Sequence, residues 1–195
     1  MGQNVGRGLI DAKDSLDMPA FIKGVEDAMA KRESAVPPEE LQAALNKFGQ
    51  AVMAAKQAKQ EADSKKNKEE GEAYLKENGA KQGVTTTSSG LQYEVLKQGT
   101  GAKPVDGDSV SVNYKGTLLD GTVFDSSENH GGPATFTVGG MIPGFDEALK
   151  LMPVGSKYRF VIPSELAYGE NGAGGDIGPN ATLIFEVELL DIKGS

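Results

Sequence analysis

Tyr114-Lys-Gly-Thr-Leu-Leu-Asp-Gly-Thr-Val-Phe-Asp-Ser-Ser127 is the stretch of this 195-residue chain that decides the fold of its C-terminal part. It follows an alternating segment, Val110–Tyr114, and it contains the pair Asp120-Gly121, a common signal for a tight hairpin turn. Val123–Asp125 then resumes a strand-like pattern. The stretch therefore predicts two antiparallel strands joined by a tight turn.

Three later segments place large apolar side chains beside glycine or proline, or just after them. They are Met141-Ile-Pro-Gly-Phe145, Leu166-Ala-Tyr-Gly169 and Ala181-Thr-Leu-Ile-Phe185. Glycine and proline bend the backbone, so such segments can bring aromatic rings together around one space. We expect them to line an apolar hollow.

The remaining C-terminal pattern predicts a sheet with one helix. Strands are expected at about 91–96, 109–115, 122–125, 134–138, 156–162 and 181–192, with a helix at 144–151. Short connections favour antiparallel pairing, and a single helix must cover the apolar face of the sheet. The predicted class is α+β, with an antiparallel sheet wrapped on a short helix and an all-helical region before it.

The N-terminal part shows helical periodicity. Residues 1–15 contain a short helical candidate, and a clearer amphipathic helix follows Asp17, a residue suited to capping, with Pro19 in its first turn. A long helix is expected from Glu39 to about Asn78, ending at Gly79. Its second half, Lys56–Glu72, lacks large apolar residues, so we expect that half to lie in solvent.

The apolar stripe of these helices is too small to bury a core by itself. We therefore predict a homodimer through residues 18–55. Its core would contain the large apolar residues of both helices, namely Phe21, Ile22, Val25, Leu41, Leu45, Phe48 and Val52. The alternative is a helical hairpin that packs on the C-terminal domain of the same chain.

Composition excludes several classes of function. Residues 101–195 hold 6 Lys and Arg against 13 Asp and Glu, an acidic balance that argues against nucleic acid as a partner. The chain has no Cys and one His, so it offers neither a thiolate nucleophile nor a multi-His metal site. We expect no transmembrane segment, because no apolar run of about 18 residues occurs. No signal peptide is recognisable either.

In this order and spacing, the C-terminal segments resemble the FKBP family of peptidyl-prolyl cis/trans isomerases over residues 87–192. With helices before it, the whole chain resembles the bacterial Mip, FklB and FkpA branch, whose members are usually homodimers. The resemblance implies an FKBP-like fold and three parts. These are a dimerisation domain at 1–55, a solvent-exposed helical linker at 56–86 and an isomerase domain at 87–195.

The same resemblance assigns a site. Asp125 would be a buried, hydrogen-bonded carboxylate that faces the rotating carbonyl, and Tyr168 would donate its hydroxyl to the substrate carbonyl. Ile142 would offer its backbone N–H. The substrate-binding residues around the proline ring would be Tyr114, Phe124, Met141, Ile142, Phe145, Ile177 and Phe185. No cofactor or metal is implied.

Each of these residues also has a simpler interpretation. The apolar ones could belong to an ordinary core, Asp125 could close a turn, and the Tyr168 hydroxyl could be bonded within its own loop. Three positions depart from the family pattern. Phe145 stands where many members have Trp, His130 where some have Arg, and Asp176 where the side chain is often apolar. We interpret His130 as a solvated loop residue.

The resemblance implies an enzyme that accelerates rotation about Xaa-Pro bonds and assists protein folding without a covalent step. The alternative is a chaperone or peptide-binding module with little turnover. Expected partners are proline-containing polypeptides, folding intermediates, tacrolimus-type or rapamycin-type macrolides as inhibitors, and a second copy of the chain. Relatives of this branch lie in the cell envelope or the cytoplasm, and between the two we favour the periplasm.

Overall fold

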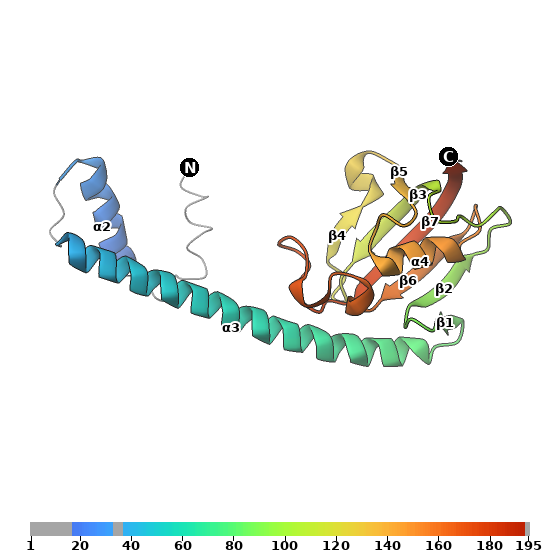
Figure 1. Ribbon diagram of the computed structural model, residues 1–195, viewed down its shortest axis with the longest axis horizontal. Coiled ribbons are helices and arrows are strands. Elements are labelled where there is room, and N and C mark those ends of the chain that lie inside the picture. The colour runs from blue at the N-terminus through green and yellow to red at the C-terminus, as the bar shows by residue number, and fades with distance from the viewer. Residues whose placement is uncertain (1–16, 33–36, 194–195) are drawn as a thin grey trace. The chain divides into compact units, whose positions relative to one another are not determined.

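The computed structural model describes residues 17–32 and 37–193 (Figure 1). The chain divides into two compact units, residues 1–61 and 62–195. Helix α3, Pro38–Gly79, begins in the first unit and ends in the second. The helix predicted within residues 1–15 lies outside the described residues.

The first unit contains α2, Met18–Met29, and the N-terminal part of α3. Asp17 caps α2 as predicted, because its side chain accepts a hydrogen bond of 3.1 Å from the backbone N–H of Ala20. Proline stands in the first turn of α2. The long helix expected at 39–78 is also present, with one further residue at each end.

The second unit is built on an antiparallel sheet. Its strands are β1 Val84–Thr86, β2 Gln92–Lys97, β3 Ser109–Thr117, β4 Val123–Ser126, β5 Ala134–Thr137, β6 Lys157–Ile162 and β7 Leu183–Lys193. The order is β1-β2-β6-β7-β3-β4, and β5 pairs with β3. All pairings are antiparallel, as predicted. Sequence patterns missed the short strand β1 and the 3₁₀ turns Ser127–His130, Ser164–Leu166 and Gly169–Asn171.

The turn between β3 and β4 forms as the sequence indicates. Gly121 adopts a φ of 87°, a value that side chains other than glycine rarely allow. The Asp120 side chain accepts a hydrogen bond of 2.9 Å from the backbone N–H of Thr122. This hairpin positions Phe124 and Asp125 in the middle of β4, Val123–Ser126.

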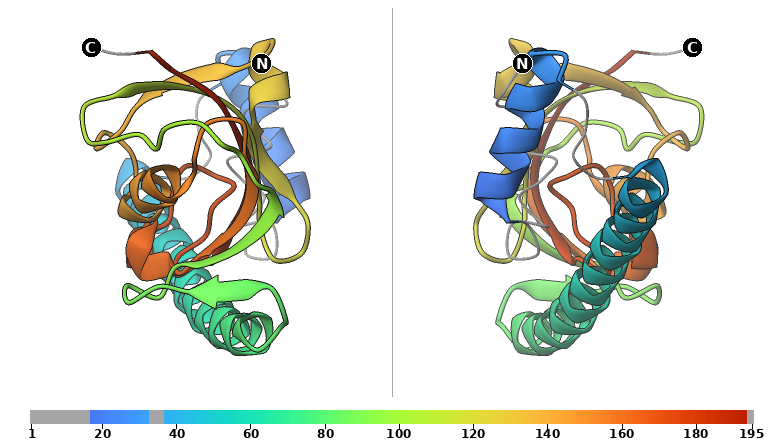
Figure 2. Two further views of the ribbon diagram at one scale, coloured as in Figure 1. Left: turned by 90° about the vertical axis from the view of Figure 1, so that its right-hand side faces the viewer. Right: turned by 90° about the vertical axis from the view of Figure 1, so that its left-hand side faces the viewer.

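The core of this unit lies between the sheet and α4, Pro143–Leu151, which packs on the concave face of the sheet (Figure 2). Phe145, Ala148 and Leu149 of α4 are almost fully buried against residues of β3, β6 and β7. Gly144 allows the close approach, because a Cβ there would collide with Ile162 of β6. The predicted α+β class is confirmed.

The C-terminal part of α3 is exposed over most of residues 56–70, as expected for a linker, but positions closer to its end are buried. Asn78 is buried and donates to the Gln92 side chain at 2.9 Å, and Gln92 donates to the Leu75 carbonyl at 2.8 Å. Gly71 is buried against Thr182, where a Cβ would collide with the hydroxyl. Polar and small residues thus fix this segment to the second unit, whereas the expectation of exposure rested on its lack of large apolar residues. The division into three functional domains stays a prediction.

Within residues 17–32 and 37–193, every helix is too short or too polar to span a bilayer.

We expect Gly144→Ala to destabilise the second unit by about 1–3 kcal/mol, the usual cost of overpacking a well-filled core. Thermal unfolding should show a lower Tm. The matched control is Gly175→Ala, since a Cβ there would meet nothing within 4 Å. Equal melting temperatures for the two variants would contradict the close packing of α4 on β6.

Candidate active site

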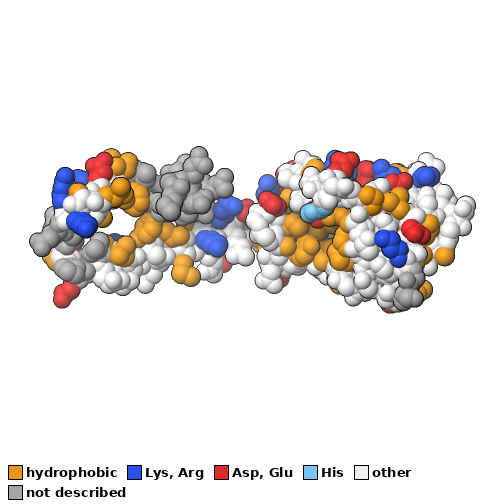
Figure 3. All heavy atoms as spheres, turned by 90° about the horizontal axis from the view of Figure 1, so that it is seen from above, with side chains coloured by type: hydrophobic (Ala, Val, Ile, Leu, Met, Phe, Trp, Pro, Cys, Tyr) orange, Lys and Arg blue, Asp and Glu red, His pale blue; other side chains and the backbone are white. Residues whose placement is uncertain are grey.

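An open cavity of about 330 Å³ lies on the second unit and is lined mainly by aromatic and aliphatic side chains (Figure 3). The structure brings all nine predicted site residues to this cavity: Tyr114, Phe124, Asp125, Met141, Ile142, Phe145, Tyr168, Ile177 and Phe185. Phe136, Ala173, Gly174 and Asp176 complete the lining. The apolar hollow expected from the sequence is therefore present.

Phe145, in the first turn of α4, is the aromatic side chain at the centre of the lining. Its ring centroid lies 5.1 Å from that of Phe185, 5.7 Å from that of Phe136 and 6.4 Å from that of Tyr114, each pair in an edge-to-face arrangement. Phe124 packs edge-on against Phe185 at 5.5 Å. Such arrangements are favourable for aromatic rings and fix their orientations.

Phe136 of β5 is the aromatic lining residue that sequence reasoning missed. A signal was available, because Ala134, Phe136 and Val138 alternate with two threonines and so share one face of a strand. β5 pairs with β3 through Val110↔Phe136, which places the Phe136 ring 5.4 Å from that of Tyr114. The face was predictable, but its position beside the cavity depends on this long-range pairing.

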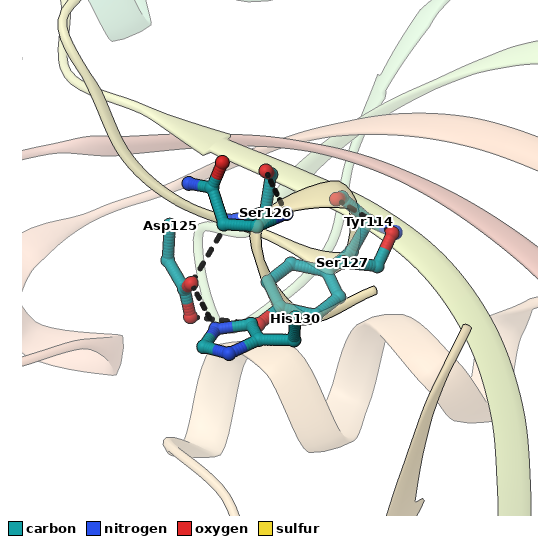
Figure 4. A network of polar contacts seen from close by, with 6 residues as sticks. Tyr114, Asp125, Ser126, Ser127 and His130 are labelled. Carbon is teal, nitrogen blue, oxygen red and sulfur yellow. Dashed lines mark hydrogen bonds and ion pairs between the residues drawn. The ribbon is translucent and has the colours of Figure 1, made fainter. Parts of the chain in front are cut away.

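Asp125 is the centre of a polar network at one edge of the cavity (Figure 4). Its Oδ2 accepts a hydrogen bond of 2.7 Å from the Tyr114 hydroxyl, and its Oδ1 accepts one of 2.8 Å from the backbone N–H of Ser126. The side chain is 41% exposed, so it is half-buried where a buried carboxylate was expected. These bonds fix the orientation of the carboxylate.

The network also sets the protonation states of Asp125 and Tyr114. Burial alone would raise the pKa of Asp125, but the hydrogen bonds from Tyr114, His130 and Ser126 outweigh it, and the pKa lies below its ordinary value. Burial, and next the hydrogen bond to Asp125, raises the pKa of the Tyr114 hydroxyl. At neutral pH the carboxylate is therefore ionised and the hydroxyl remains a donor.

His130 joins this network, although the sequence suggested a solvated loop residue. Its Nε2 lies 2.9 Å from Asp125 Oδ1, and because an ionised carboxylate only accepts hydrogen bonds, Nε2 is the donor. The imidazole is 62% exposed, so it is indeed solvated on its other side. The 3₁₀ turn Ser127–His130 brings it back to Asp125, a contact that the spacing of five residues did not reveal.

Asp146 shapes the wall that holds Met141 and Ile142. Its buried carboxylate accepts hydrogen bonds from the backbone N–H groups of Gly139 at 2.9 Å and Met141 at 3.1 Å. These two bonds fix the turn before α4, at whose N-cap Ile142 stands. Nothing in the sequence pattern indicates this role, because an aspartate in the first turn of a helix commonly interacts only with the helix itself.

Some hydrogen-bond donors of the residues that line this cavity have no partner in the described part of the chain. Tyr168 is 39% exposed and its hydroxyl makes no hydrogen bond among residues 17–32 and 37–193. Within the same ranges, the backbone N–H of Ile142 has no acceptor. The interpretation of Tyr168 as an internally bonded loop anchor is therefore not supported.

Within residues 17–32 and 37–193, no group of three or more His, Asp or Glu residues could hold a metal ion. What the cavity offers is an apolar, aromatic space with the ionised carboxylate of Asp125, a second carboxyl side chain in Asp176, and the available hydroxyl of Tyr168. Such a space suits a ligand that is compact and apolar with carbonyl groups attached.

Comparison with known proteins gives two family-model matches that together cover nearly the whole chain. Residues 100–190 match the model of the FKBP-type peptidyl-prolyl cis-trans isomerase, and residues 1–95 match the domain amino-terminal to such isomerases. The chain belongs to the FKBP-type peptidyl-prolyl cis-trans isomerase family.

Relatives of this FKBP-type chain match it over both units. It is 47% identical to the probable FKBP-type isomerase FkpA of Neisseria meningitidis, over 98% of this chain and 72% of the relative. It is 42% identical to the outer membrane protein MIP of Legionella longbeachae, over 99% of this chain and 83% of that protein. The crystal structure of FkpA from Escherichia coli superposes with a TM-score of 0.80 at 42% identity, covering 99% and 93% of the two chains.

The recognition of an FKBP-type enzyme from sequence is thereby confirmed, and so is the expected fold. This FKBP-type protein is a peptidyl-prolyl cis/trans isomerase. The individual roles of its site residues remain proposals.

We expect Tyr114→Phe to raise the pKa of Asp125 toward that of a free side chain, because the variant loses the hydrogen bond at Oδ2. A titration of the Asp125 carboxyl carbon by NMR would measure this shift. Tyr168→Phe is the control, since Tyr168 makes no hydrogen bond to Asp125. Identical Asp125 titrations in wild type and Tyr114→Phe would contradict the network.

The pH dependence of stability should follow from the lowered pKa of Asp125. The folded state holds the pKa of Asp125 below its unfolded value, about 3.9, so the ionised side chain stabilises the fold above that pH. The contribution is lost as the pH falls through the folded pKa. In Tyr114→Phe the shift is smaller, so acid should remove less stability through this residue, as denaturant unfolding at several pH values would show.

Proposed function

We propose that the 330 Å³ cavity binds the proline ring of a substrate polypeptide and lowers the barrier to rotation about the preceding Xaa-Pro bond. That barrier, about 18–20 kcal/mol, arises from amide resonance. A catalyst therefore has only to bind the twisted amide more tightly than the planar one. The proposed reaction has no covalent step and needs no cofactor.

The observation that supports this proposal is the small set of polar groups in an otherwise apolar cavity. Aromatic walls exclude water, whose hydrogen bonds favour the planar, charge-separated amide. The unpartnered Tyr168 hydroxyl would donate to a substrate carbonyl, and the Ile142 N–H would bind a second carbonyl. Phe145 would form the floor beneath the proline ring.

Asp125 would act through its charge rather than as a base. Both of its oxygens already accept hydrogen bonds, and its pKa is lowered, so it is a poor proton acceptor at neutral pH. A carboxylate held in a fixed orientation can interact with the carbonyl of the twisted amide. Asp125 and Tyr168 are therefore the proposed catalytic residues.

Tyr168→Phe should lower kcat/KM for a short Xaa-Pro peptide by about tenfold, the equivalent of one lost hydrogen bond of about 1.4 kcal/mol. The measurement is the cis/trans relaxation rate of the peptide. Tyr93→Phe, outside the cavity, is the matched control and should keep the wild-type rate. Full activity in Tyr168→Phe would remove this hydroxyl from the mechanism.

The same assay tests the cavity as the place of reaction. We propose that tacrolimus-type or rapamycin-type macrolides bind there and abolish the acceleration of the wild-type protein. If the macrolide bound to a protein that gave no acceleration, the chain would be a peptide-binding module with little turnover.

We further propose a homodimer through residues 18–55. Within the single chain, Ile22 is 51% exposed, Val25 44% and Leu45 55%, although all three are large and apolar. Phe21, Phe48 and Val52 are half-buried. A second copy would cover these side chains, which a lone pair of helices cannot bury. The Leu41 side chain lies outside the described residues.

Leu45→Glu combined with Phe48→Glu should yield monomers in analytical ultracentrifugation, because two buried charges would face an apolar interface. Lys47→Glu is the control, since it adds an acidic charge on the same helix at an already charged, exposed position. A double variant that sediments as a dimer would place the interface elsewhere.

Proline-containing polypeptides and folding intermediates are the proposed partners, with the two copies acting on one client. The monomeric variant should then keep its rate on a short peptide and lose most of its effect on a protein whose refolding is limited by a prolyl bond. Equal losses in the two assays would contradict this proposal.

For the compartment, we propose the bacterial cell envelope. The support is the 42% identity to a relative whose name is outer membrane protein MIP. Fractionation of cells that produce the natural protein would test it, and recovery in the cytoplasmic fraction would overturn it.

A further inference from the structure

Residues 169–180, here called the cavity loop, connect Tyr168 to the segment before β7. The loop contributes Ala173, Gly174, Asp176 and Ile177 to the cavity. Its internal structure is slight, consisting of the turn Gly169–Asn171 and a single bridge between Ala173 and Ile177. Ile177 is nevertheless 9% exposed, so the loop must be held in place by its surroundings.

Two side chains of α3 contact the end of the cavity loop. Asn67 Nδ2 donates to the carbonyl oxygen of Pro179 at 2.8 Å, and Asn180 Nδ2 donates to Ser64 Oγ at 2.8 Å. Both bonds are partly buried. Ser64 and Asn67 lie three residues apart, on one face of the helix.

These contacts involve the chain neighbours of two proposed site residues, Tyr168 and Ile177. The backbone N–H of Asn180 donates to the Gly169 carbonyl at 2.8 Å, and Gly169 follows Tyr168 in the chain. Gly178, which follows Ile177, lies so close to Asn67 that a Cβ there would be 3.0 Å from Asn67 Nδ2. One helical turn of α3 is thus connected to both sides of the loop.

Asn180 is held at this junction through both its side chain and its backbone. Its φ is 54°, a left-handed value that asparagine tolerates better than most residues other than glycine. The bonds to Ser64 and Gly169 fix its side chain and its backbone in this conformation.

We propose that Ser64 and Asn67 are positioning residues of the isomerase, which hold the cavity loop so that Ile177 and Tyr168 face the substrate. The inference rests on the proposed roles of those two residues. It extends the working site to a helix that lies outside the predicted isomerase domain.

A second attachment of α3 to the same unit supplies the control. Asn78 donates to Gln92 at 2.9 Å, and the Tyr74 hydroxyl accepts from Arg159 at 3.1 Å. These contacts reach β2 and β6 rather than the cavity loop. Loss of this attachment should lower stability and leave the loop in place.

The test uses the full chain with Ser64→Ala and Asn67→Ala combined. We expect kcat/KM for a short Xaa-Pro peptide to fall on the order of 10-fold, because small displacements of positioned groups are costly. With isoleucine methyl labelling, the Ile177 signal should shift or broaden, while that of Ile142, at the N-cap of α4, stays in place. Asn78→Ala should lower Tm without changing kcat/KM or the Ile177 signal. All assays are run well below the lowest Tm.

Ser64→Thr, which keeps the hydroxyl, should retain the wild-type rate and the wild-type Ile177 signal. Wild-type values in the double alanine variant would overturn the inference, and so would an equal Ile177 change in Asn78→Ala. The two variants distinguish a failure of this inference from a failure of the proposed function. If Tyr168→Phe lowers the rate and the double variant does not, the function stands and the positioning role fails.

Discussion

The contact of the Phe145 ring with the sheet is the interaction on which both the fold and the site depend. Phe145 is 2% exposed, yet it belongs to the core and to the cavity lining at once. Its neighbours Phe136 and Phe185 come from strands far apart in the sequence. The cavity is therefore the open end of the hydrophobic core, and the packing that stabilises the fold also orients the rings that would surround proline.

Such a site needs rigidity more than reactive groups. Amide rotation requires no nucleophile, metal or proton transfer, so the useful properties are exclusion of water and dipoles that are fixed in advance. The chain supplies both with ordinary residues. Asp125 is held by Tyr114 and Ser126, and Asp146 fixes the turn that presents Met141 and Ile142. None of these carboxylates is free to move.

Sequence reasoning located strands β2 to β7 and helix α4 to within about two residues, and the structure places all nine proposed site residues at one cavity. It succeeded because alternation, hairpin signals and glycine positions are local properties, and the family resemblance supplied their arrangement. It missed the Asp125–His130 contact and Phe136, which depend on the path of a turn and on strand pairing. Most of residues 56–72 are exposed, as expected, but the attached face of α3 was missed, because hydrophobic periodicity cannot detect a face made of serine, asparagine and glycine.

The contacts made by that face of α3 limit how far the length of the helix can vary. Ser64, Asn67, Gly71 and Asn78 are separated by three, four and seven residues, the spacing that returns to one side of a helix. Deleting or inserting one residue among them would rotate the following positions by about 100° relative to the preceding ones, so the two groups could not face the second unit together. A stretch that has the composition of an interchangeable spacer is thus bound to a fixed length, and replacement by a generic helical linker would preserve its span but not its attachment.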